Sequence, residues 1–388
     1  MDYKKLLEND KEYIVKLRRE FHSNPEPSWK EFQTSKRIKE ELKRIEIPYI
    51  EIAGTGVIAT IKGDHPGKTV ALRADMDALA VNEENDIEYK SQNPGVMHAC
   101  GHDGHSAMLL GAARALVKIK DKIKGSIKLI FQPAEELVQG AKKLIEEGAL
   151  EGVDGILGIH LWSGVETGRI SVESGPRMAS GDLVIIDIIG KGGHGSMPHQ
   201  GVDATVVASS LIMNTQSILS REISPLDPVV FTIGELRAGT RFNVIAEKAH
   251  LEGTIRCFKP EIRAKLPEII KRHANSTAST YRAKAEVQYI KGTPPTINDS
   301  KCSSIAESTV LSMLGEDGLM KMEKTTGSED MAYYLEKIPG LIAFVGTRNA
   351  EKQSDFPHHH PRFNIDEDSL IIGTELYVRF AIDFLEKF

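Results

Sequence analysis

The chain has 388 residues, a length that allows two domains, each with its own hydrophobic core. Its composition, 40% hydrophobic and 27% charged, is that of a globular protein, and its formal net charge of −6 argues against nucleic-acid binding. No apolar run approaches the roughly twenty residues that cross a bilayer, and the charged first ten residues lack a signal-peptide core. Three widely spaced cysteines argue against a disulfide framework. We therefore expect a cytoplasmic protein without nucleic-acid or membrane partners.

The first fifty residues have the periodicity of two helices. Apolar residues recur at steps of three and four up to Asn24-Pro25, which predicts a first helix that ends there. Residues 28–31, Ser-Trp-Lys-Glu, have the form of a capping box and predict a second helix that continues through Ile45.

Strands and helices then alternate along the chain. β-rich runs end just before clusters of polar residues, and one long amphipathic segment separates them. This alternation implies an α/β fold with a mostly parallel sheet and helices on both faces. We predict strands at 57–61, 69–73, 126–131 and 155–159 and a helix at 103–118.

The pattern changes between residues 182 and 292. Here the order is strand, helix, strand, strand, helix, strand, which is typical of a ferredoxin-like unit. The flanking segments 1–181 and 293–388 then form one discontinuous domain into which this unit is inserted. The predicted elements are strands at 183–189, 229–235, 249–258 and 283–290 and helices at 203–220 and 260–282.

Residues 97–105 read Met-His-Ala-Cys-Gly-His-Asp-Gly-His and are the most informative segment of the chain. A thiolate and imidazoles are the ligands that a borderline-soft divalent ion prefers, so Cys100 and His102 indicate a transition-metal site. Two plainer interpretations remain: three histidines so close together can form a solvated loop, and a single free cysteine can be a small buried hydrophobe.

Further polar groups follow the predicted strands. Residues 132–136 read Gln-Pro-Ala-Glu-Glu, His160 follows the strand at 155–159, and residues 358–361 read His-His-His-Pro. Open α/β sheets build their sites where strands end, so we expect these groups to converge.

Together these motifs resemble the M20 family of metallopeptidases and amidohydrolases, and above all its aminoacylase, hippurate hydrolase and IAA-amino acid hydrolase-like subfamily. The resemblance covers nearly the whole chain. It implies a zinc-exopeptidase-like catalytic domain and an inserted ferredoxin-like lid and dimerisation domain. The motifs that carry it include Leu-Arg-Arg-Glu-Phe-His at 17–22, Leu-Arg-Ala-Asp-Met-Asp-Ala-Leu at 72–79, Gly-Gly-His-Gly-Ser at 192–196, Arg-Phe-Asn-Val-Ile at 241–245 and Gly-Ser-Glu-Asp at 327–330.

The resemblance implies two divalent metal ions, which could be Zn, Mn, Co or Ni. It makes Cys100 the bridging ligand, with His102 and His160 completing one ion and Glu136 and His359 the other. We expect the neighbouring His358 and His360 to be loop histidines in solvent, and we expect His105 to support the site or the fold without binding metal.

Two acids follow the strand at 69–73. Asp75 stands where other M20 branches place a ligand histidine, so its role is open, and we expect it to orient a ligand. Asp77 would fix the orientation of a ligand imidazole without binding the metal itself.

Glu135 and Glu136 are adjacent, and adjacent acids are ordinarily a solvated charge run. The resemblance instead assigns Glu135 as the general base that takes a proton from water and returns it to the leaving nitrogen. It also implies that His194 and Asn243 polarise the scissile carbonyl. Arg241 is a candidate for binding a substrate carboxylate, although an arginine in such a turn can simply be exposed.

We therefore expect metal-dependent hydrolysis of the amide bond of N-acyl amino acids by a homodimer. A carboxypeptidase or dipeptidase acting on the same site is the alternative, with a short peptide as its substrate. A metal-binding protein without turnover is a more remote alternative, because it has no need of a base such as Glu135.

Overall fold

The computed structural model describes residues 3–388, which divide into two compact units. The first unit takes in the chain up to Gly175, together with Ile297–Glu323 and Asp330–Phe388. The second unit comprises Pro176–Thr296 and Lys324–Glu329. Among residues 3–388, no helix combines the length and the apolar composition needed to span a bilayer.

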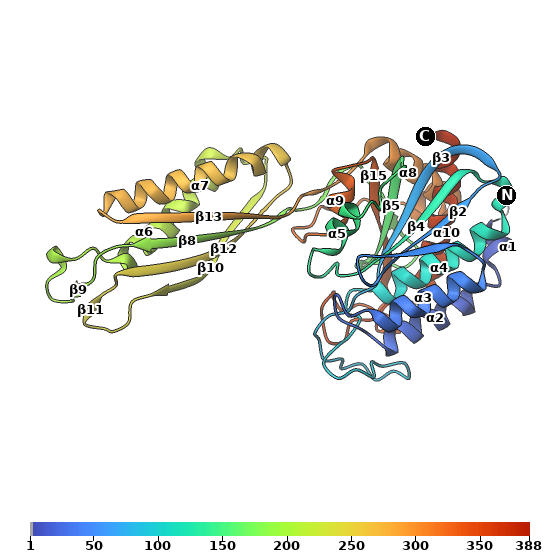
Figure 1. The fold of residues 1–388 in the computed structure, drawn as a ribbon, viewed down its shortest axis with the longest axis horizontal. Coiled ribbons are helices and arrows are strands. Elements are labelled where there is room, and N and C mark those ends of the chain that lie inside the picture. Colours follow the sequence, from blue (N-terminus) through green and yellow to red (C-terminus); the bar gives the residue numbers. More distant parts are fainter. Residues whose placement is uncertain (1–2) are drawn as a thin grey trace. The chain divides into compact units, whose positions relative to one another are not determined.

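The first unit is built on a seven-stranded sheet with the order β1-β2-β4-β3-β5-β15-β6 (Figure 1). The four central strands, β4, β3, β5 and β15, pair in parallel, whereas the outer pairings are antiparallel. The predicted mostly parallel central sheet is confirmed. The strands are β1 (Tyr49–Ile52), β2 (Gly56–Lys62), β3 (His65–Asp75), β4 (Lys124–Gln132), β5 (Gly155–Glu166), β6 (Ile170–Ser171) and β15 (Gly340–Arg348).

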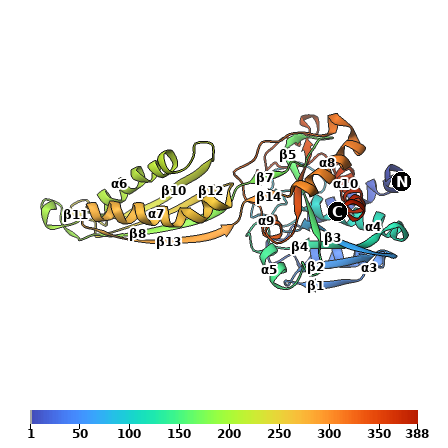
Figure 2. The ribbon, with the colours of Figure 1, turned by 90° about the horizontal axis from the view of Figure 1, so that it is seen from above.

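Helices cover both faces of this sheet (Figures 1 and 2). On one face α4 (His102–Lys118) and α10 (Asp368–Lys387) pack on each other and on β3, while α5 (Gly140–Glu146) and α9 (Met331–Leu335) pack together on the other. The central strands are buried on both sides, which explains their nearly continuous apolar sequences. The remaining helices are α1 (Tyr3–Leu7), α2 (Lys11–Ser23), α3 (Phe32–Arg44) and α8 (Ser300–Leu314).

The predicted capping box at 28–31 is wrong. The helix α3 begins at Phe32, and the Ser28 hydroxyl donates a hydrogen bond to Asp77 Oδ2 at 2.6 Å instead of capping it. The carboxylate of Glu26 accepts the N–H groups of Gln33 and Thr34 at 3.0 and 2.9 Å, so it satisfies the free donors of the first turn. Ser28 does not cap the helix, because its hydroxyl is bonded to the buried carboxylate of Asp77.

The second unit has a four-stranded antiparallel sheet with the order β10-β12-β8-β13, and two helices cover one of its faces (Figure 1). This is the topology of a ferredoxin-like unit. Its elements are β8 (Gly181–Ile189), α6 (Ala204–Ser217), β10 (Val229–Ala238), β12 (Lys248–Cys257), α7 (Pro260–Thr280) and β13 (Lys284–Thr293), with a small ladder of β9 (Gly193–His194) and β11 (Val244–Ile245); β7 (Gly175–Met178) and β14 (Thr296–Asn298) lie where the chain passes between the units.

A largely buried ion pair in the second unit joins β8 to α7. The Asp182 carboxylate is fully buried and accepts hydrogen bonds from Arg263 Nε and Nη2 at 2.9 and 2.6 Å. The Tyr289 hydroxyl and the Gly292 N–H donate to the same carboxylate at 2.7 and 2.9 Å. One acid therefore joins the start of β8 to α7 and to the end of β13.

We predict that Asp182→Asn destabilises the second unit by about 3 kcal/mol, because it removes the buried counter-charge of the largely buried Arg263. Asp227→Asn, which removes the partner of the half-exposed Lys259, should cost less than about 1 kcal/mol. Urea unfolding followed by circular dichroism measures both variants. The two tryptophans, Trp29 and Trp162, lie in the first unit, so their fluorescence shows whether that unit is affected. Equal losses in the two variants would contradict the role given to Asp182.

Candidate metal centre

The parallel register of the central strands brings the polar strand ends together. Asp75, the last residue of β3, is level with Gln132, the last residue of β4. On its other side Arg73 is level with Gly158, so His160, two residues further, lies beside Asp75. His160 is inside β5, which continues to Glu166, and does not follow a strand that ends at residue 159 as predicted; its pairing with β15 extends the strand.

Five predicted ligands meet at this edge of the sheet in two groups. The ligand atoms of Cys100, His102 and His160 lie within 4.8 Å of one another, and so do those of Cys100, Glu136 and His359. Cys100 belongs to both groups. The set of one thiol, three imidazoles and one carboxylate suits first-row divalent ions.

The spacing of these atoms fits ligands that share an ion. Ligands at about 2.0–2.3 Å from a tetrahedral ion lie roughly 3.3–3.8 Å apart. Cys100 Sγ is 3.6 Å from His160 Nε2, and His359 Nε2 is 3.6 Å from Glu136 Oε1. His102 Nε2 and Glu136 Oε1 are buried without a hydrogen bond, an arrangement that is costly unless a cation completes it.

His160 presents its free nitrogen to the site. Its Nδ1 lies 2.8 Å from the Leu161 carbonyl oxygen, which can only accept, so Nδ1 carries the proton and Nε2 keeps a lone pair. Burial and the neighbouring His105 and His358 hold the pKa of His160 well below its ordinary value. A neutral imidazole with Nε2 toward Cys100 is the form that binds metal.

The electrostatics of the site call for positive charge. Burial alone would lower the pKa of His102, but the carboxylates of Asp75, Asp77 and Glu136 outweigh it and raise that pKa to about 10. Burial raises the pKa of Glu136 to about 7. The negative charges of Asp77 and Asp75 add to this rise, whereas the positive charge of His102 opposes it. These carboxylates favour any cation placed between them, and a divalent ion would take the place of the proton.

Asp77 organises the two glutamates. Its Oδ1 accepts the N–H of Glu135 and its Oδ2 the N–H of Glu136, both at 3.1 Å. Oδ1 also lies 3.3 Å from His102 Nδ1. One buried carboxylate therefore lies against the imidazole of a predicted ligand and holds the loop that carries both acids.

Asp75 is held by other groups of the protein. Its Oδ1 lies 2.6 Å from His105 Nδ1, and its Oδ2 accepts from Arg73 Nη1 at 2.7 Å. The Leu161 N–H donates to His105 Nε2 at 2.9 Å, so His105 carries its proton on Nδ1, toward Asp75. His105 and Asp75 thus link the end of β3 to the strand that carries His160.

Unusual backbone conformations shape the loops of the site. Ala134 and His359 have φ angles of +53° and +65°, in the left-handed region that costs a non-glycine residue about 1–2 kcal/mol. Gly101 has φ +93° directly before α4, and a Cβ on Gly140 would lie 1.7 Å from the Pro133 carbonyl oxygen. The His359 N–H donates to the Ala99 oxygen at 2.8 Å, which fixes this loop beside Cys100.

Glu135 is buried next to the predicted ligands. Its Oε1 accepts the N–H of Asp330 at 3.4 Å, and its Oε2 is 3.9 Å from His102 Nε2. The residue is 7% exposed, so its carboxylate is largely shielded from bulk water.

The expectation that His358 lies in solvent is wrong. His358 packs on Trp162 and Phe363 with ring centroids 4.6 and 5.1 Å apart. Its Nε2 lies 2.9 Å from the Leu161 oxygen and its Nδ1 3.2 Å from Ser163 Oγ. Nothing in three consecutive histidines indicated that His358 would be packed against aromatic residues.

The sequence also gave no role to a buried network behind α4. Asp103 accepts from Arg18 Nε at 2.8 Å and lies 2.8 Å from His22 Nδ1, and His22 Nε2 lies 3.1 Å from Glu83 Oε1. Arg18 and His22 are one helical turn apart on the buried face of α2. Charged residues among the apolar positions of a helix were the signal that could have found them.

His194, Arg241 and Asn243 lie in the second unit and are exposed. His194 pairs with Val244 in the β9–β11 ladder, and the Gly195 N–H donates to the Asn243 oxygen at 2.9 Å, so the two predicted carbonyl-binding residues are neighbours. The Ser196 N–H donates to His194 Nδ1, so the neutral ring carries its proton on the exposed Nε2.

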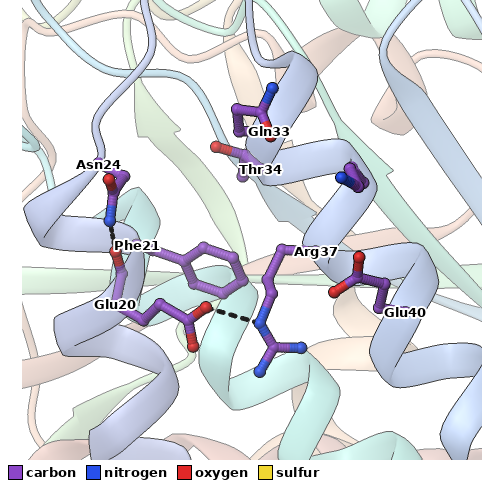
Figure 3. Close-up of a pocket in the computed structure, with 8 residues that line it drawn as sticks. Glu20, Phe21, Asn24, Gln33, Thr34, Arg37 and Glu40 are labelled. Carbon is purple, nitrogen blue, oxygen red and sulfur yellow. Dashed lines mark hydrogen bonds and ion pairs between the residues drawn. The ribbon is translucent and has the colours of Figure 1, made fainter.

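A surface groove between α2 and α3 is a poorer candidate site (Figure 3). None of the predicted ligands lines it. Its acid Glu20 accepts from Arg37 Nε at 2.7 Å, and the Asn24 side chain donates to the Glu20 carbonyl oxygen at 2.9 Å. These groups satisfy one another.

The comparisons with known proteins agree on one family. The sequence model of Peptidase family M20/M25/M40 matches residues 71–383. The chain is 41% identical to thermostable carboxypeptidase 2 of Saccharolobus solfataricus over 100% of both proteins. It is 39% identical to an N-acetylcysteine deacetylase of Bacillus subtilis, across 96% of this chain and 97% of that protein.

A solved structure gives the same result. The Bacillus subtilis YXEP protein, a dinuclear metal-binding peptidase from the M20 family, matches with a TM-score of 0.87 at 35% identity. The match covers 97% of this chain and 99% of that one.

We predict that Cys100→Ala loses metal, because the thiol belongs to both ligand groups. Metal per chain after loading and dialysis, measured by mass spectrometry, should fall toward one ion or none. Cys302→Ala is the matched control, since Cys302 is buried in α8 and burial raises the pKa of its thiol to about 12. Metal content in Cys100→Ala equal to that of the control would rule out the shared ligand.

Proposed function

Because the chain belongs to Peptidase family M20/M25/M40 and is a metal-dependent hydrolase of amide bonds, we propose that it cleaves the amide of N-acyl amino acids. The observation that carries the proposal is the pair of ligand groups joined at Cys100, with the buried acid Glu135 beside them. We propose that two divalent ions, such as Zn, Mn, Co or Ni, bind there.

The relatives support an amide that carries an amino acid's nitrogen. A carboxypeptidase removes a terminal residue from a peptide, and an N-acetylcysteine deacetylase removes an acetyl group from an amino acid. Both reactions release an amino acid with a free carboxylate. A carboxypeptidase or dipeptidase is therefore the second candidate, favoured by the 41% identity to a carboxypeptidase.

The proposed chemistry assigns each carboxylate one task. When bound, the ions would polarise the scissile carbonyl and lower the pKa of water. Glu135 would take the proton of the attacking water and return it to the leaving nitrogen as the amide bond breaks. Its neighbour Glu136 would bind metal, and Asp77 would hold both in place through their N–H groups.

The second unit would contribute donors to the carbonyl oxygen. His194 carries a proton on an exposed Nε2, which suits it to donate a hydrogen bond to a developing oxyanion. Asn243 would supply the other donor. Arg241, two residues earlier, would bind the free carboxylate of the substrate through its planar fork.

A comparison of substrates tests the proposed specificity. Acetyl, benzoyl and longer acyl amino acids are assayed beside dipeptides with Zn²⁺, Mn²⁺ and Co²⁺ in turn. We expect the highest kcat/KM on an acyl amino acid. A clear preference for dipeptides would favour the second candidate, and no hydrolysis of either class would contradict both.

We predict that Glu135→Gln keeps its metal and loses turnover by at least about 10²–10⁴-fold, because the amide keeps the shape and cannot accept the proton. Glu136→Gln should instead lower metal content. Metal analysis and kcat on the best substrate separate the two variants. If the two phenotypes were exchanged, the assignment of base and ligand would be wrong.

We propose that the enzyme is a cytoplasmic homodimer. The outer strands β10 and β13 of the second sheet have no further strand beside them in the part of the chain that the structure describes. An uncovered strand edge is an aggregation hazard, and two-fold pairing is a common solution.

Mixed dimers test whether His194 acts on the partner's site. We predict that inactive His194→Ala and inactive Glu135→Gln chains recover activity when mixed, because one site then has an intact base and an intact histidine. Subunit exchange is verified with a fluorescent label on each chain. If subunit exchange is proven and activity does not recover, His194 acts on the site of its own chain.

A further inference from the structure

Asp330 lies directly before α9, and its side chain is completely buried. Its Oδ1 accepts from Arg73 Nη2 at 2.8 Å, and both of its oxygens lie 2.8 Å from Gln132 Nε2. The Ala141 N–H donates to Oδ2 at 2.9 Å. One carboxylate therefore joins the end of β3, the end of β4 and the start of α5.

The backbone of Asp330 faces the proposed base. Its N–H donates to Glu135 Oε1, which leaves Oε2 on the side of His102. A rotation of the Glu135 carboxylate would break this contact. The position of the Asp330 backbone therefore influences where the base points.

Arg73 anchors Asp330 to the ligand side of the site. Its Nε donates to Gln132 Oε1 at 2.8 Å, and its Nη1 donates to Asp75, the partner of His105. The three nitrogens of one planar guanidinium thus have three different partners. The Tyr377 hydroxyl donates to the Arg73 carbonyl oxygen at 2.6 Å and fixes the backbone beneath it. If this guanidinium moved with one partner, it would break its hydrogen bond to another.

We propose that Asp330 is a positioning residue. Its side chain is fixed by Arg73 and Gln132, and its N–H holds the Glu135 carboxylate in place beside the predicted ligands. This rests on the proposed function, which makes Glu135 the base. Catalytic groups have to be held within about 0.5 Å of their productive place, so a small displacement costs rate without costing the fold.

The test compares Asp330→Asn with Asp10→Asn. Asp10 is a matched control, because it is also a buried acid before a helix, bonded to Arg114 Nε and Lys118 Nζ at 3.1 and 2.7 Å. Those partners lie roughly 18–24 Å along α4 from His102. We expect Asp330→Asn to lower kcat about 10–100-fold, with KM within about twofold and metal per chain unchanged. Asp10→Asn should lower only the melting temperature.

A double variant shows whether the effect passes through Glu135. Added to Glu135→Gln, the change Asp330→Asn should lower the residual rate by less than about twofold, because the base is already absent. A full multiplicative loss would overturn the proposal. So would a kcat within about twofold of wild type in folded Asp330→Asn, or a loss explained by missing metal.

Two arrangements keep the test decisive. If Asp330→Asn yields no folded protein, Arg73→Lys replaces it, because lysine keeps the charge and loses the fork; the same fall in kcat at constant KM is expected. All rates are taken on the amide that the wild type cleaves fastest. If that amide is not an N-acyl amino acid, the proposed substrate fails, while the ratio of variant to wild type still decides the role of Asp330.

Discussion

Four carboxylates, those of Asp75, Asp77, Glu135 and Glu136, are gathered at one edge of the central sheet, and their charge has to be compensated. An isolated ionised acid is very costly to bury, so each needs a partner. Asp75 has Arg73, and Asp77 has two N–H groups and a hydroxyl. Burial raises the pKa of Glu136 to about 7, and its Oε1 has no hydrogen-bond partner among the described residues. The missing counter-charge is what a divalent cation would supply.

The parallel sheet is the device that makes this gathering possible. Strands β3 and β4 end at the same edge of the sheet, and β5 runs beside them there. Residues far apart in the chain therefore meet at this edge. The helices on both faces shield the strands from water, and the resulting low dielectric strengthens the electrostatic interactions at this edge. The same burial holds His160 neutral, as a ligand imidazole must be.

Much of this could be predicted, because periodicity and motif spacing are local properties. The parallel core and the Cys100 segment follow from short stretches of sequence. Other features depend on segments that meet only in the fold. The Arg73–Asp330 pair spans 257 positions, and nothing in the motif around either residue indicates the other. The packing of His358 on Trp162 could not be predicted, because it depends on how the loop turns in the fold.

The capping box shows a different limit. A serine three residues before a glutamate satisfies the pattern, yet a buried carboxylate is a better partner for its hydroxyl than a helix end that Glu26 already serves. Local rules are overridden where the site has charge to compensate. Two departures from such rules, the left-handed backbone at Ala134 and at His359, lie in the loops that carry Glu136 and His359.

We propose that two ions share the Cys100 thiolate, and X-ray absorption at the metal edge is the direct test. In the fully loaded enzyme we expect one sulfur at about 2.3 Å from each ion, nitrogen and oxygen at about 2.0–2.2 Å, and a second metal roughly 3.5–4 Å away. A spectrum with nitrogen and oxygen ligands alone, without sulfur or a neighbouring metal, would contradict it.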